Sequence, residues 1–343
     1  EALTNIALAP LTYGLDGVSL SANWMWPCRQ PGEDARLYDA VEAASDFAIS
    51  LGINIPTGKD SLSMTQKYPE GKQVLSPGTV IISAVAEVSD VRSIVSPVLR
   101  PEPSYPVYHI DFSFAPLELG GSALAQVLGQ VGNETPAIEE PEYFREAFTA
   151  VQELIERGVL VAGHDISSGG LITALLEMCF PNRQGGLEVD LGAFPAGDLT
   201  KLLFAENPGL LVQTNDPAQL EEVLRASSIG FARIATPTKD GRTLTLRQGK
   251  QTLSLDIDAK RDVWYRSSYL LDQHQSGEVL AKERFTNYKH QPLRYAFPAG
   301  FTGKLKDLGL DPDRTNPSRV KAAILRDKGT NGEREMAYAL WLA

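Results

Sequence analysis

The chain has 343 residues, more than one hydrophobic core usually holds, so two or more domains are expected. Its apolar content of 43% and charged content of 22% are typical of a globular protein. A formal net charge of −11 argues against non-specific binding to nucleic acids or anionic membranes, and no apolar run is long enough to span a bilayer. The two cysteines, Cys28 and Cys179, are too few for a disulfide framework and favour the reducing cytoplasm.

Residues 1–98 are predicted to form a first domain. Two stretches have helical spacing of apolar residues, and three short segments are apolar or β-branched in the manner of strands. The predicted helices cover 2–8 and 31–44, and the predicted strands cover 18–22, 53–56 and 79–86.

Residues 99–268 are predicted to form a second domain, which opens at a proline-rich boundary. Strands are expected over 107–111 and 159–162, and helices over 123–127, 141–157 and 171–179. Alternation of the two kinds of element is typical of helices layered on a sheet, so the predicted fold class is α/β with α+β layering.

The remaining residues are predicted to be a polar linker over 269–318 and the start of another domain over 319–343. In the latter, a strand over 320–325, a turn over 329–332 and a helix from Glu333 would be the first βα unit of a doubly wound sheet. Both chain ends fall within helical patterns, so we expect the chain to be part of a longer one.

The turn between the strand at 159–162 and the helix at 171–179 carries the densest set of functional residue types. It contains Asp165, Ser167, Gly169 and Gly170. Glycines allow a ligand to approach the backbone closely, a helix N-terminus presents free N–H groups to an anion, and an aspartate can hold the divalent ion of a polyphosphate. The plainer interpretation is that Asp165 or Ser167 only caps the helix.

Two further pairs of polar residues are candidates for the same chemistry. Glu1 and Asn5 are four residues apart and share one helix face, which suits magnesium, although the same pair fits a solvated surface. Lys59 and Asp60 follow the strand at 53–56 on a glycine turn, where they would contact phosphate or form a surface ion pair.

Four ordered segments of the chain resemble one family, the large single-chain phosphoribosylformylglycinamidine synthases. The segments are Glu1–Ala7; Leu20–Met25 with Pro31–Asp34; Gly58–Met64; and His164–Leu171. The tail from Val320 resembles the opening of the family's glutaminase domain. The resemblance covers essentially the whole chain.

The resemblance implies domains like the N- and C-terminal domains of aminoimidazole ribonucleotide synthetase, followed by a truncated glutaminase domain. It also implies a part in the ATP-dependent ligation that converts formylglycinamide ribonucleotide and glutamine to the formylglycinamidine in purine synthesis. The chain resembles the second of two synthetase copies. The catalytic cysteine and histidine of the glutaminase would lie beyond residue 343, so no catalytic residue is assigned.

The resemblance also implies roles for individual residues. Glu1, Asn5 and Asp165 match the family's magnesium ligands, and Ser167 matches a residue that contacts ATP or ADP. Ile166 and Ser168 stand where many members have arginine and a second aspartate, which leaves any role of those charges open.

Three functional interpretations follow. The chain is part of the ligase itself; or it is a structural module that binds ADP and magnesium without turnover; or it belongs to a related kinase of the selenophosphate or thiamine-phosphate type. The glutaminase-like tail argues against the third. The expected partners are the small-molecule substrates, the rest of the same chain and, through an uncovered apolar face, a second copy in a homodimer.

Overall fold

The structure, a computed structural model, describes residues 1–194, 197–290, 296–302, 304–309, 320–327, 330 and 332–342. The chain divides into two compact units, Glu1–Thr286 and Asn287–Ala343. Within the described residues no helix has both the length and the apolar character that a membrane span requires.

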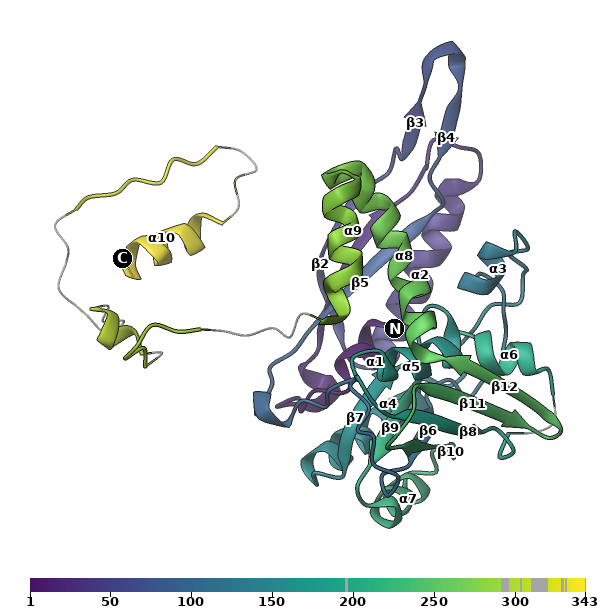
Figure 1. The fold of residues 1–343 in the computed structure, drawn as a ribbon. Coiled ribbons are helices and arrows are strands. Elements are labelled where there is room, and N and C mark those ends of the chain that lie inside the picture. The colour runs from purple at the N-terminus through teal and green to yellow at the C-terminus, as the bar shows by residue number, and fades with distance from the viewer. Residues whose placement is uncertain are drawn as a thin grey trace. The chain divides into compact units, whose positions relative to one another are not determined.

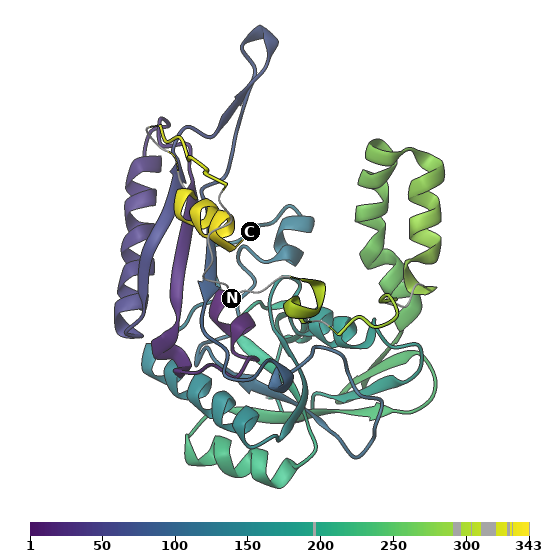
Figure 2. The same cartoon turned by 90° about the vertical axis from the view of Figure 1, so that its left-hand side faces the viewer.

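A three-stranded sheet forms the first layer of the larger unit (Figures 1 and 2). Its strand order is β2-β1-β5, with β2 parallel and β5 antiparallel to the central strand. Helix α2 lies against this sheet, and the β3–β4 hairpin projects beyond it. The elements are α1 (Ala2–Ile6), β1 (Ser19–Met25), α2 (Glu33–Ser50), β2 (Asn54–Ser61), β3 (Thr65–Lys67), β4 (Gln73–Leu75) and β5 (Thr79–Val85).

A mixed seven-stranded sheet forms the second layer, in the order β12-β11-β8-β10-β6-β9-β7. Most of its neighbours are antiparallel, whereas β11 and β8 are parallel. The strands are β6 (Val107–Asp111), β7 (Leu160–Asp165), β8 (Gly186–Asp190), β9 (Gly209–Thr214), β10 (Phe231–Thr238), β11 (Thr243–Gln248) and β12 (Gln251–Asp256).

Two hydrophobic cores cover the two faces of this sheet. Alternation along β6 sends Tyr108 and Ile110 into one core, together with α4, and Val107 into the other, together with α5. Helix α7 belongs to the first core and α6 to the second. These helices are α3 (Ala123–Val127), α4 (Pro141–Glu156), α5 (Gly170–Cys179), α6 (Leu199–Phe204) and α7 (Pro217–Ala226). The predicted α/β layering is therefore confirmed.

The segment predicted as a polar linker over 269–318 begins with helical structure that the sequence did not predict. Helices α8 (Ile257–Ser276) and α9 (Glu278–Asn287) form a hairpin there (Figure 1), held by Arg284 on Asp272 and by stacking of Tyr269 on Phe285 at 4.7 Å. Because this hairpin buries little besides Ile257 and Ala281, its sequence lacks the apolar spacing that identifies a packed helix. Residues 291–295, 303 and 310–319 lie outside the described part.

The second unit confirms one of its predicted elements and contradicts another. Helix α10 (Glu333–Leu342) is present, but 320–327 is not a strand. A strand requires a hydrogen-bonded neighbour, and none lies beside this segment among the described residues of the unit. Gly329 and Asn331 of the predicted turn are outside the described residues.

Short 3-10 helices occur in both units, at Gly14–Gly17, Pro69–Gly71, Val91–Ser93, Tyr288–His290 and Leu305–Leu308.

Candidate functional site

The predicted strand-to-helix turn is formed as expected. Strand β7 ends at Asp165 and α5 begins at Gly170. Gly169 and Gly170 have φ of 91° and 70°, and a Cβ on Gly170 would lie 2.7 Å from the Leu203 carbonyl oxygen. The glycines are required because the turn has left-handed backbone and touches the C-terminal end of α6.

The plainer interpretation, in which an acid or hydroxyl caps α5, is wrong. Gly169 is the N-cap, and no side chain makes a capping hydrogen bond. Asp165 and Ser167 instead line a cleft of about 790 Å³, which we call the Asp165 cleft. Its other lining residues are Glu1, Ala2, Asn5, Ile6, Val80, Ile81, Ile82, Ser83, Ala84 and His164.

Helix α1 brings Glu1 and Asn5 to this cleft. Leu3 and Ala7 bury the opposite side of the helix, and Gln152 of α4 holds the Ala7 carbonyl oxygen at 2.7 Å. The side chains of Glu1, at the start of α1, and Asp165, at the end of β7, both line this cleft although they are distant in sequence.

The donor set of the cleft fits magnesium. Two carboxylates and one amide supply hard oxygen atoms, and Asp165 is buried while Glu1 and Asn5 are exposed. Among the described residues no group of three or more His, Cys, Asp or Glu side chains is placed to hold a metal ion, so a cation in the cleft would also need the amide oxygen of Asn5 and water. No Lys or Arg lines the cleft, so a polyphosphate entering it would need a cation to offset the two carboxylates.

His164 lines the cleft, and its ring is held between Asp165 and Glu177. Its Nδ1 lies 2.7 Å from the Asp165 carbonyl oxygen, and its Nε2 lies 3.5 Å from a Glu177 carboxylate oxygen. Glu177 also accepts a 2.8 Å hydrogen bond from the indole N–H of Trp264. These contacts hold the end of β7 against α5 and α8, which supports a positioning role for His164.

Lys59 and Asp60 do not lie on a turn. Strand β2 continues to Ser61, so both residues pair with β1, and the Lys59 ammonium donates to the Ser61 hydroxyl at 2.8 Å. The prediction of a glycine turn failed because Gly58 serves strand pairing: its Cβ would lie 2.1 Å from the Ala22 carbonyl oxygen. Strand β1 separates these residues from β5, which lines the cleft, and their contact with a nucleotide stays a prediction.

Glu206 is a residue that the sequence did not single out. Its carboxylate accepts hydrogen bonds from Gly169 N–H at 2.7 Å and from Ala123 N–H at 2.8 Å. It therefore joins the turn before α5 to the glycine-containing turn before α3. An isolated acid between a helix and a buried strand carries no local pattern, so no sequence signal could have found it.

Comparison with known proteins assigns the class of both halves of the larger unit. Residues 1–87 match the FGAR-AT PurM_N-like domain, and residues 112–244 match the C-terminal domain of AIR synthase related proteins. The PurL of T. maritima solved with ATP and the one solved with FGAR have the same fold. Their TM-scores are both 0.51, at 14% and 15% identity over 74% of this chain and 38% and 43% of theirs. The chain thus has the predicted aminoimidazole ribonucleotide synthetase-like fold.

Curated relatives narrow the class. The human phosphoribosylformylglycinamidine synthase is 36% identical over the whole chain, and a probable phosphoribosylformylglycinamidine synthase of Arabidopsis thaliana is 35% identical. The chain spans about a quarter of these relatives, 26% and 24% of their lengths. The chain belongs to the phosphoribosylformylglycinamidine synthase family, as its four motifs predicted.

Proposed function

We propose that the chain is part of an ATP-dependent ligase that converts formylglycinamide ribonucleotide and glutamine to formylglycinamidine ribonucleotide. Within that enzyme, the Asp165 cleft is a structural site for ADP or ATP with magnesium. Similarity of the whole of this chain to part of the human and Arabidopsis thaliana synthases supports the first statement. The T. maritima proteins of the same fold, which were solved with ATP and with FGAR, are consistent with it.

One observation carries the proposal for the cleft. Glu1, Asn5, Asp165 and Ser167 come from chain segments more than 150 residues apart, yet they line one cleft whose described lining contains no Lys or Arg. In this arrangement Glu1, Asn5 and Asp165 hold magnesium, Ser167 donates to the nucleotide, and the ion neutralises the phosphate charge. Lys59 and Asp60 extend the proposed nucleotide contacts from β2.

Calorimetric titration of the protein with ADP and ATP tests this function. We expect both nucleotides to bind with magnesium, and binding to disappear when the ion is chelated, because two carboxylates then repel the phosphates. Hydrolysis measured in parallel should stay at background. Equal affinity with and without magnesium would contradict the metal site, and rapid ATP turnover would contradict the structural role.

The proposal extends to assembly, compartment and domain boundaries. Strand β5 is an outer strand of the three-stranded sheet, and the exposed side chains of Val80, Ile81 and Val85 lie on it. We propose that this edge pairs with a second copy, that the domains are 1–98, 99–268 and 319–343, and that the protein works in the cytoplasm. Two free cysteines support the last point.

Light scattering tests the dimer. At high concentration the mass should be twice that of one chain, and Val85→Asp, at a side chain that is 67% exposed, should shift the protein to monomer because it places a charge in the interface. Asp replacement of the exposed Val263 on α8 is the control and should leave the mass unchanged. A monomeric mass for the unaltered protein at every concentration would contradict the dimer.

A further inference from the structure

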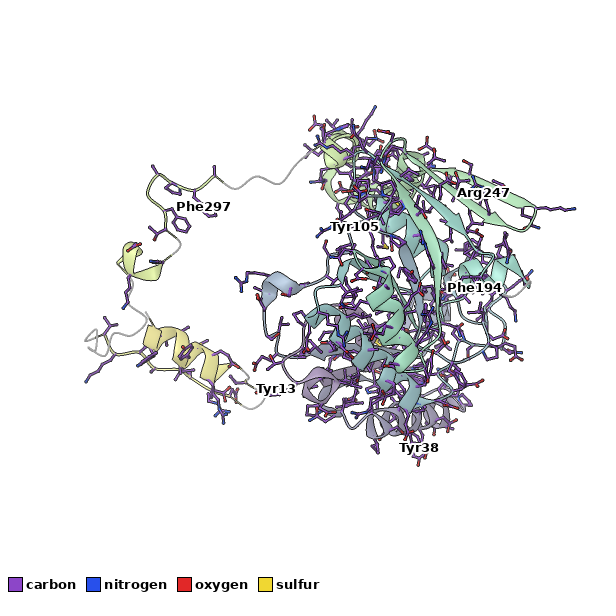
Figure 3. All side chains as sticks on the ribbon, turned by 90° about the horizontal axis from the view of Figure 1, so that it is seen from below. Tyr13, Tyr38, Tyr105, Phe194, Arg247 and Phe297 are labelled. Atoms are coloured by element: carbon purple, nitrogen blue, oxygen red, sulfur yellow. The ribbon has the colours of Figure 1, made fainter. Side chains whose placement is uncertain are left out.

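A second cavity lies on the α5–α6 face of the seven-stranded sheet and shares no lining residue with the Asp165 cleft. It has a volume of about 510 Å³, within the range of small-molecule sites. Its main walls are His109 and Asp111 of β6, Phe231 of β10, Lys201 of α6, Phe194 and Gln248. Figure 3 shows Phe194 on the same side of this unit as Arg247 of β11, the neighbour of Gln248. We call this space the His109 cavity.

The charged groups around the His109 cavity are already paired within the protein. The Asp111 carboxylate accepts hydrogen bonds from Ser113 and Phe114, and Lys201 forms a 2.6 Å ion pair with Glu118. Asp198 caps α6 through the Thr200 N–H. A phosphate or carboxylate ligand would have to break one of these pairs, so the cavity favours an uncharged ligand.

His109 and Gln248 are the neutral polar groups that remain. Burial lowers the pKa of His109, against the field of Asp111, so the imidazole is neutral and offers one donor and one acceptor. Within the described residues no hydrogen bond to its ring nitrogens is formed; the ring packs edge-on against Phe194 at 5.6 Å. The amide of Gln248 presents a donor and an acceptor side by side.

The shape and chemistry of the walls select a flat ligand. Phe194 presents aromatic surface, and the remaining walls are largely apolar. A heterocycle with an N–H donor next to a ring-nitrogen acceptor would pair with the Gln248 amide and fill the apolar space. We propose that the His109 cavity is a second binding site, for a small, flat, uncharged nitrogen heterocycle of one or two rings.

The position of the cavity explains why such a site would matter. A small space of about 30 Å³ also touches His109 and Phe194 and is closed by Ile166 and Leu171. Ile166 is the residue between Asp165 and Ser167, and its backbone N–H donates a hydrogen bond to the Gly209 carbonyl oxygen at 2.9 Å. A ligand in the His109 cavity therefore lies behind the turn that carries the Asp165 cleft.

Titration with 7-azaindole, followed by calorimetry and NMR, tests the site because this two-ring probe carries the required adjacent donor and acceptor. We expect saturable binding with Kd of roughly 0.1–1 mM, as is usual for so small a ligand. Ala193→Trp should weaken binding at least about tenfold, because Ala193 is an exposed lining residue and the indole would enter the cavity. Ala226→Trp, on an exposed position of α7 outside the cavity, should not.

A second probe and a second variant separate pairing from simple apolar burial. Indole lacks the acceptor nitrogen and should bind several-fold more weakly than 7-azaindole, and Gln248→Ala should remove that difference. Lack of saturable binding, or equal binding to Ala193→Trp, would overturn the proposal. Since the readout is binding of the probe, its failure is distinct from a failure of magnesium-dependent nucleotide binding at the Asp165 cleft.

Discussion

Asp165→Ala should lower the affinity of the protein for magnesium ADP by about two orders of magnitude, roughly 2.7 kcal/mol. Asp165 is the buried carboxylate of the cleft, so the charge that it gives to a bound cation is screened little by water. Glu1 and Asn5 are exposed and compensate only in part. Calorimetry with and without magnesium measures the change.

Asp165→Asn and an exposed acid serve as controls for this prediction. The asparagine variant keeps the side-chain shape and should lose most of the magnesium-dependent affinity, because the charge is removed. Asp240→Ala changes an exposed residue outside the cleft and should bind like the unaltered protein. Retained affinity in both Asp165 variants would show that the nucleotide does not depend on a metal held there.

Gly170→Ala should destabilise the protein by roughly 2–5 kcal/mol. A left-handed backbone costs an alanine about 1–2 kcal/mol, and relief of steric overlap adds about 1–3 kcal/mol. The added Cβ would lie 2.7 and 2.8 Å from the backbone carbonyl oxygens of Leu203 and Ala205. Backbone atoms cannot move away by a change of rotamer, as a side chain can. Urea unfolding measures the loss of free energy.

Gly121→Ala is the matched control for that prediction. Gly121 has a φ of 74°, close to the 70° of Gly170, but a Cβ there meets nothing within 4 Å. We expect the Gly121→Ala protein to lose only the part of the stability that comes from the left-handed backbone, about 1–2 kcal/mol of unfolding free energy. Equal losses in the two variants would mean that contact with the C-terminal end of α6 does not constrain the turn.

The helices and strands of the larger unit were predictable because each buries one face, and that burial leaves a periodic pattern of apolar residues in the sequence. Helix α2 begins at Glu33, two residues after the start of the predicted helix at 31–44, and β5 runs from Thr79 to Val85, within the predicted 79–86. The α8–α9 hairpin was missed because it exposes most of its side chains, so burial left no periodic pattern in it. The strand predicted at 320–325 failed because a strand depends on a neighbour that lies elsewhere in a sequence.

The sequence by itself determined the family and the strand-turn-helix unit that carries Asp165 and Ser167. Motifs such as Gly58–Met64 and His164–Leu171 are contiguous, and contiguous residues can be compared without knowing the fold. Only the tertiary structure decided which residues meet. It joined Glu1 and Asn5 with Asp165, kept Lys59 on another strand, and placed Glu206 between two helix starts, because strand order and packing, which are long-range, set those distances.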